Sequence, residues 1–121
     1  MRIFRLLPHV ILCLFLAAAA SAQAPKFLSV IDDLPLMPGL TEDTDAGMVF
    51  DGPTGRIVEA FAAGGVTAEA VRGYYLQTLP QLGWTRKAPG LFQRDDEVLK
   101  LEVAPAAAGA GVHFTLRPAG S

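Results

Sequence analysis

Apolar and polar residues alternate along the second half of the chain. In the run 98–103, the apolar residues Leu99, Leu101 and Val103 alternate with Lys100 and Glu102, which is the period of a half-buried β-strand. The same reading, with turn residues between the runs, predicts strands at 84–87, 91–94, 98–103 and 112–117. Strands joined by tight turns pair antiparallel, so these four should form a meander. The Ala/Gly-rich segment 105–111 is expected to be a loop.

A helical pattern precedes these strands. Apolar residues recur at helical spacing at Val71, Tyr75, Leu79 and Leu82. We therefore predict a helix from about residue 68 to about residue 82, with Thr67 as its N-cap and Gly83 as its C-cap. Pro80 should kink this helix or reduce its last turn to a looser form.

Two strand-forming runs lie before the helix. Residues 48–51 and 56–61 flank the turn sequence Gly52-Pro53-Thr54-Gly55, which predicts a β-hairpin. The expected fold class is therefore α+β. It is a two-layer sandwich in which the hairpin is followed by one helix packed on the antiparallel four-stranded meander. Residues 48–121 would form this single domain.

An extended arm, residues 23–47, precedes the hairpin. Pro35 and Pro38 remove backbone donors, and Gly39 indicates a turn. The arm is nevertheless too apolar for a free linker. Its apolar residues either pack on their own domain or form a partner surface together with one exposed helical aromatic. The candidate surface residues are Leu34, Leu36, Met37, Leu40 and Tyr74.

The N-terminal segment has the pattern of a Sec-type signal peptide. Arg2 and Arg5 precede an uninterrupted apolar run, 10–20, and Ala20-Ser21-Ala22 matches the cleavage pattern. The apolar run is about half of the roughly 20 residues that a spanning helix needs. We therefore expect residues 1–22 to be removed, which places the protein in the periplasm or outside the cell with no membrane span.

Composition excludes several classes of function. Cleavage after Ala22 removes 22 of the 121 residues and leaves 99, enough for one domain. Removing Arg2 and Arg5 leaves eight basic residues against 12 acidic ones, a balance that disfavours nucleic acid and anionic membrane surfaces. Cys13, the only cysteine, lies in the signal, so no disulfide or thiolate chemistry is expected.

Candidate catalytic groups are few. His113 is the only histidine beyond the predicted signal, and alternation places it on the solvent face of the last strand. No catalytic serine, zinc or phosphate-loop motif occurs. Asp43 and Asp45 resemble the start of a calcium loop, but later positions lack the oxygen ligands that calcium needs. We therefore expect a solvated acidic loop, no metal and no cofactor.

A longer pattern resembles a class of small exported bacterial proteins whose helix ends in Leu-Gly-Trp before an antiparallel meander. The resemblance rests on the helix and its exit (74–84), on the strand sequences 92–94 and 99–101, on the arm (33–40) and on the hairpin (55–59). It implies an exported protein of this architecture and carries no activity, cofactor or site residue.

Three functions are compatible with these observations. The preferred one is a non-catalytic accessory module of the cell envelope that binds a protein or a peptide, because a small sheet with an open edge can accept a partner strand. A small periplasmic hydrolase would have to use carboxylates such as Asp43 and Asp45 with Arg56. A carrier of a small apolar ligand would need a cavity of about 300 Å³ or more between helix and sheet, and a domain of this size is expected to fill its own interior.

Overall fold

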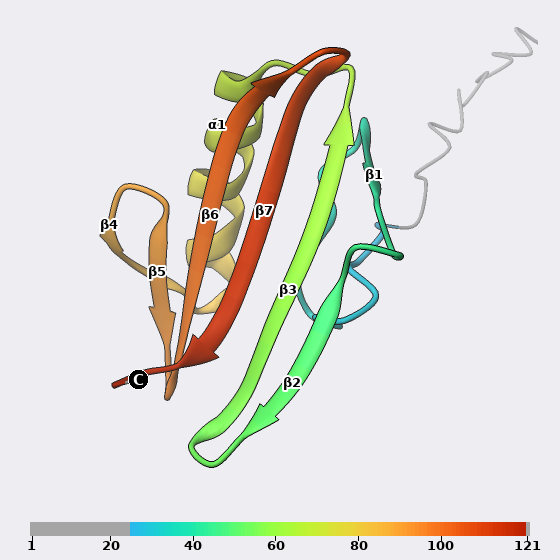
Figure 1. Ribbon diagram of the computed structural model, residues 1–121. Coiled ribbons are helices and arrows are strands. Elements are labelled where there is room, and N and C mark those ends of the chain that lie inside the picture. Colours follow the sequence, from blue (N-terminus) through green and yellow to red (C-terminus); the bar gives the residue numbers. More distant parts are fainter. Residues whose placement is uncertain (1–24, 121) are drawn as a thin grey trace, which may run out of the picture.

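The computed structural model describes residues 25–120, so the predicted signal peptide, residues 1–22, lies outside the described residues (Figure 1). The described chain contains one α-helix that continues into a short 3-10 helix, and strands before and after it. The strands are β1 (Leu40–Glu42), β2 (Met48–Gly52), β3 (Gly55–Gly64), β4 (Thr85–Ala88), β5 (Leu91–Arg94), β6 (Glu97–Ala106) and β7 (Gly109–Pro118), and the helices are α1 (Ala68–Thr78) and η1 (Leu79–Leu82).

All seven described strands belong to one antiparallel sheet. Their order is β1-β3-β7-β6-β5-β4, and β2 also pairs with β3. The long β3 pairs with β7 from Val58, opposite Leu116, to Gly64, opposite Ala110. This pairing continues the meander β4 to β7 into the hairpin β2–β3, and the arm adds β1.

The predicted fold class is therefore wrong. The protein is a β-rich fold built on a seven-stranded antiparallel sheet with one short helix, and not a two-layer α+β sandwich with a separate hairpin and a four-stranded meander. The physical reason is the long-range pairing of β3 with β7. Local sequence patterns predict six of the seven described strands and miss β1, which lies in the predicted arm. The lateral neighbours of a strand depend on residues distant in the chain.

The prediction of a loop at 105–111 is also wrong, because most of this segment belongs to strands. β6 continues to Ala106 and β7 begins at Gly109, so only two residues form the turn. The small side chains serve close packing here. A Cβ on Gly109, whose φ is +139°, would lie 2.2 Å from the carbonyl oxygen of Gly64. Small residues at this corner therefore let the end of β3 approach the β6–β7 turn.

The helix follows its sequence signals closely. The Thr67 hydroxyl accepts a hydrogen bond from the Ala70 amide at 3.0 Å, which confirms the N-cap. Pro80 converts the last turn to the 3-10 helix η1, and Gly83 ends it in the left-handed region with φ +90°. The Trp84 amide then donates to the Leu79 carbonyl at 3.1 Å, which fixes the direction of the chain into β4.

The hydrophobic core lies between one face of the sheet and two covering segments. Figure 1 shows α1 behind β6 and β7, and the arm behind β3. The sheet contributes alternate residues, including Val58, Leu99 and Phe114, all fully buried. Tyr75 from α1 contacts Phe114 in an edge-to-face arrangement, with ring centroids 5.3 Å apart. Helix and arm thus share the covering of a single face.

The arm belongs to this core. Leu28, Ile31 and Leu34 are each at most 2% exposed. The Tyr75 hydroxyl bonds to backbone atoms of Pro35 and Met37, which ties the arm to the helix.

Within residues 25–120, no helix has the length and hydropathy needed to cross a membrane.

Candidate functional site

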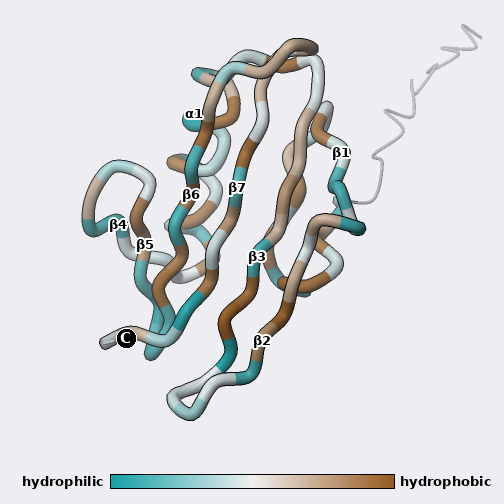
Figure 2. The backbone as a smooth tube through the Cα atoms, in the orientation of Figure 1, coloured by the Kyte–Doolittle hydropathy of each residue, from teal (hydrophilic) through white to brown (hydrophobic). Residues whose placement is uncertain are grey.

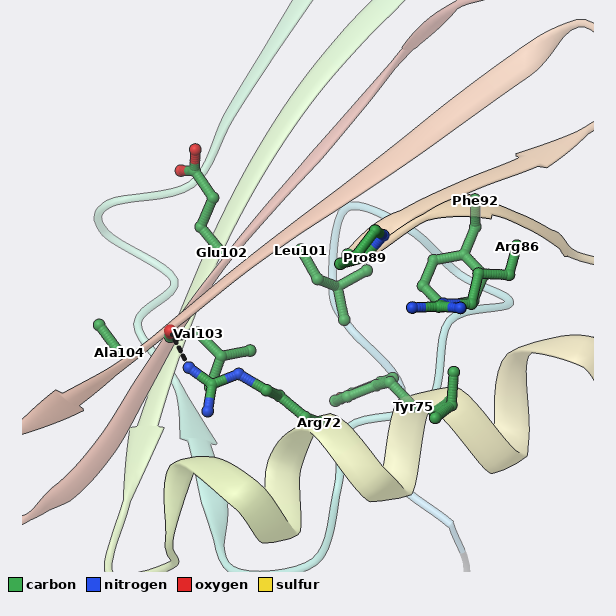
Figure 3. Close-up of a pocket in the computed structure, with 11 residues that line it drawn as sticks. Arg72, Tyr75, Arg86, Pro89, Phe92, Leu101, Glu102, Val103 and Ala104 are labelled. Atoms are coloured by element: carbon green, nitrogen blue, oxygen red, sulfur yellow. Dashed lines mark hydrogen bonds between the residues drawn. The ribbon is translucent and has the colours of Figure 1, made fainter.

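A pocket of about 490 Å³ lies between α1, the β4–β5 turn and residues 101–104 of β6, which do not pair with β5 (Figure 3). Its lining is mainly apolar, with two arginines and one acidic residue among the described residues that surround it. The lining residues are Arg72, Tyr75, Leu76, Arg86, Pro89, Gly90, Phe92, Leu101, Glu102, Val103 and Ala104. The volume exceeds the threshold of about 300 Å³ that a ligand-binding cavity requires.

The pocket exists because β5 is much shorter than β6. β5 pairs with β6 from Leu91, opposite Lys100, to Arg94, opposite Glu97. The Leu101 amide then donates to the Gly90 carbonyl at 2.8 Å, and beyond this bond no described strand lies on that side of β6. The β4–β5 turn therefore forms one end of a gap beside the strand, and α1 forms its floor.

Gly90 is required at this end of the pocket. Its φ of +71° lies in the left-handed region, and a Cβ there would stand 2.6 Å from the Leu101 carbonyl oxygen. Only glycine lets the turn approach β6 this closely. The position of the β4–β5 turn, and with it the shape of the pocket, thus depends on this residue.

Two guanidinium groups border the apolar lining from different elements. Arg72 lies on α1 and donates a hydrogen bond from Nη2 to the Val103 carbonyl at 2.9 Å (Figure 3). Arg86 lies on β4, and no acidic side chain of the described residues pairs with it. A guanidinium carries five N–H donors, so both groups keep donors for an anionic ligand.

Glu102 does not neutralise these arginines. It borders the pocket through its place on β6, but its carboxylate points to the opposite face of the sheet (Figure 3). There it pairs with Lys100 at 2.9 Å and with His113 Nδ1 at 3.1 Å. The hydrogen bond from Lys100 and the charge of its ammonium lower the pKa of Glu102. The pocket is therefore lined by apolar groups and bordered by positive charge.

A second hollow, wider and more open, lies on the uncovered face of the sheet. Phe61 and His113 stack there with ring centroids 4.2 Å apart. The histidine Nε2 lies 3.4 Å from Glu59, and Glu42 and Asp43 line the rim. This surface is acidic and shallow, and it encloses a small molecule less well than the pocket beside β6.

The structure gives each sequence-predicted surface residue a place. Leu34, Leu36 and Leu40 are buried in the core, whereas Met37 and Tyr74 are partly buried and pack against it. Tyr74 contacts Tyr75 edge to face, with ring centroids 4.9 Å apart. The arm side chains thus face their own domain, and the pocket lies apart from them.

The candidate hydrolytic residues do not converge. The Asp43 amide donates to the Phe61 carbonyl, whereas Arg56 lies five residues earlier on β3, roughly 16 Å along the strand. Arg56 instead pairs with Glu97 at 3.5 Å. Across residues 25–120 no three metal-ligating side chains gather in a geometry that would hold an ion.

Sequence reasoning missed the pocket residues. The sequence does not mark Arg72 as a pocket residue, and it places Arg86, Phe92 and Leu101 only within the predicted strands 84–87, 91–94 and 98–103. A signal was present, because Arg72, Tyr75 and Leu76 have the spacing i, i+3 and i+4 and so share one side of the helix. The sequence does not show that this side meets an unpaired strand.

Comparison with known proteins gives no relative: no model of a protein family matches the chain, and neither curated proteins nor solved structures yield a match.

Proposed function

We propose that this protein is a non-catalytic binding protein whose pocket between α1 and β6 takes a small molecule with an apolar body and an anionic group. One observation carries the proposal. An apolar pocket of about 490 Å³ is bordered by two arginines, and no acidic side chain of residues 25–120 points into it. Pockets of this size and lining, with a few polar groups that fix orientation, are typical of small-ligand sites.

The apolar body would lie on Leu76, Phe92 and Leu101. Burial of its apolar surface contributes to the binding free energy but does not fix the orientation of the ligand. The anionic group would bind Arg86, whose charge is unpaired among the described residues, because the guanidinium of Arg72 lies beside Val103 at the other end of the pocket (Figure 3). Carboxylate and phosphate both suit the planar fork of a guanidinium. The ligand class is thus an amphipathic anion, such as a medium-chain carboxylate.

The edge of β6 beside the pocket is poorly suited to bind a peptide strand. Leu101 and Val103 direct their backbone groups to this edge, since one bonds to Gly90 and the other to Arg72. By the period of two, Pro105 is the next residue to face it, and proline has no N–H. The Val103 carbonyl already accepts a hydrogen bond from Arg72. A compact ligand therefore fits the pocket better than an added strand.

The envelope accessory module that binds a protein or peptide, and the exported location, stay predictions. Of the three functions considered, the ligand carrier now has the best support, because the pocket meets its volume requirement. The arm has lost support as a docking element, since three of its candidate leucines lie in the core.

Isothermal titration with two probes of equal chain length tests the proposal. Decanoate and decylammonium each contain ten carbon atoms and are used below their micelle concentrations. They differ in the head group, which is an anionic carboxylate in one and a cationic ammonium in the other. We expect decanoate to bind at least about tenfold more tightly, because a charge-assisted hydrogen bond contributes about 1.5–3 kcal/mol. Arg86→Gln should remove most of this difference.

Arg117→Gln is the matched control, because it removes one positive charge from an exposed position on β7 outside the pocket lining. It should leave both affinities unchanged. Equal affinity for the two probes, or an Arg86→Gln variant that retains the preference for decanoate, would contradict the proposed function.

A further inference from the structure

The hairpin β2–β3 presents an apolar surface that nothing in the described structure covers. Met48, Val49 and Phe50 follow one another on β2 and are 55%, 53% and 58% exposed, and Ile57 on β3 is 37% exposed. Figure 1 shows the hairpin projecting beyond the end of α1, and Figure 2 shows hydrophobic residues along both of its strands. Isolated exposed apolar residues are ordinary, but a contiguous group of this kind marks an interaction surface.

Among residues 25–120, β2 pairs only with β3, so the outer edge of β2 has no partner strand there. The other free edges of the described sheet have features that hinder pairing with a strand of another chain. β4 carries Arg86 and Lys87, and β1 is only three residues long. Beyond β5, the edge of β6 is covered by Arg72 and Pro105. Charge, shortness and proline are the usual means of blocking edge-to-edge association. β2 has none of them over Met48 to Phe50.

We propose that the partner at this edge is a second copy of the same chain. Two β2 strands paired antiparallel about Val49 place Met48 of one copy opposite Phe50 of the other. The same register puts Asp51 opposite Gly47. No charge then faces a like charge, so the strand is complementary to itself, as a twofold interface requires. The two sheets become one continuous sheet.

Both faces of the hairpin gain contacts in this arrangement. Phe50 lies opposite Ile57 on the uncovered face, and Val49 lies opposite the buried Val58 on the core face. Met48 and Phe50 of the two copies therefore meet beside Ile57, while the two Val49 side chains meet on the other face. The contact is confined to one five-residue strand from each copy, so we expect an interface no larger than the smallest stable ones, which bury about 1,000 Å². The dimer is accordingly weak and concentration-dependent, and it is independent of the pocket ligand.

Sedimentation velocity on the protein, purified as its host makes it, measures the association from about 10 µM to about 1 mM, the range in which weak interfaces form. We expect a reversible monomer–dimer equilibrium that Val49→Lys and Phe50→Lys each weaken at least tenfold. Leu82→Lys is the matched control, because Leu82 is a similarly exposed apolar residue on η1. It should leave the equilibrium unchanged, and the fluorescence of the buried Trp84 verifies folding of each variant.

A cysteine placed at the symmetry position tests the register. Opposite Cβ atoms of an antiparallel pair lie about 4.5–5.5 Å apart, close enough for a disulfide after small adjustment. With Cys13 replaced by Ser, Val49→Cys should form a disulfide-linked dimer on mild oxidation, and Leu82→Cys should not. A protein that stays monomeric at the highest concentration, or crosslinking no greater at position 49 than at position 82, would overturn the proposal.

Discussion

The hydroxyl of Tyr75, in the middle of α1, donates a hydrogen bond to the carbonyl oxygen of Pro35 at 2.8 Å. The same hydroxyl accepts a hydrogen bond from the Met37 amide at 3.1 Å. One side chain thus satisfies two backbone groups of a segment that lies about 40 residues away. Because the tyrosine is buried, this pair of bonds fixes the arm on the helix and closes the core on that side.

Replacing Tyr75 by Phe should destabilise the protein by about 1–3 kcal/mol, because the part-buried Met37 amide and the buried Pro35 carbonyl both lose their partner. Urea unfolding measures the change. Tyr74→Phe is the control, since no hydrogen bond of the Tyr74 hydroxyl occurs among the described residues, and it should change stability by less than about 0.5 kcal/mol. Equal effects of the two substitutions would contradict the role of the Tyr75 hydroxyl.

Alkaline pH should weaken the folded state through the same residue. Burial raises the pKa of Tyr75 above its ordinary value of 10.0. The folded state therefore holds the phenolic proton more tightly than the unfolded chain. This contribution is fully present below about pH 10 and declines as the pH rises toward the folded-state pKa, by up to about 1.4 kcal/mol per pH unit. Unfolding curves at increasing pH should show a steeper loss for the native protein than for Tyr75→Phe. Parallel curves would contradict this prediction.

The arm should be essential for stability. Leu34→Ala removes a side chain that is 1% exposed and should cost about 2–5 kcal/mol. Phe27→Ala removes a larger side chain of the same arm that is 48% exposed, so it should cost less than about 1.5 kcal/mol. Denaturant unfolding of both variants checks the order. A Leu34→Ala variant as stable as the native protein would mean that the arm does not contribute to the core.

Two glycine substitutions should have opposite effects. Gly90→Ala places a Cβ against the Leu101 carbonyl at a left-handed φ, so it should displace the β4–β5 turn, lower the free energy of unfolding and weaken decanoate binding. Gly73→Ala meets nothing within 4 Å on the surface of α1 and should stabilise the protein by about 0.5–1 kcal/mol. Thermal unfolding and titration measure both. Unchanged binding by Gly90→Ala would contradict its role in shaping the pocket.

The local elements were predictable because their signals lie within a few residues. Thr67 and Gly83 marked the ends of the helical segment, and Pro80 indicated its tighter last turn. Alternation located the central parts of β6 and β7. These features depend on backbone and side-chain preferences that act locally, so the sequence alone was sufficient for them.

The sheet and the pocket were not predictable in this way. The pairing of β3 with β7 joins segments about 50 residues apart, and nothing in the period of either strand specifies its neighbour. The pocket arises where β5 ends early beside β6, opposite Arg72 and Tyr75. The pocket therefore depends on the lengths of β5 and β6 and on how α1, β6 and the β4–β5 turn pack together. Residues such as Arg86 and Gly90 therefore acquire their roles only in the folded chain.

The most direct test of ligand binding in the pocket is to map decanoate onto the protein by amide chemical-shift changes. Binding between α1 and β6 should shift the amides of Leu76, Gly90, Leu101 and Val103 most strongly and saturably, because these residues line the pocket. The exposed apolar residues Met48, Val49 and Phe50 should shift little. If instead the largest changes fall on this hairpin, or if no amide shift saturates, decanoate adsorbs to exposed apolar surface and the pocket is not a site for amphipathic anions.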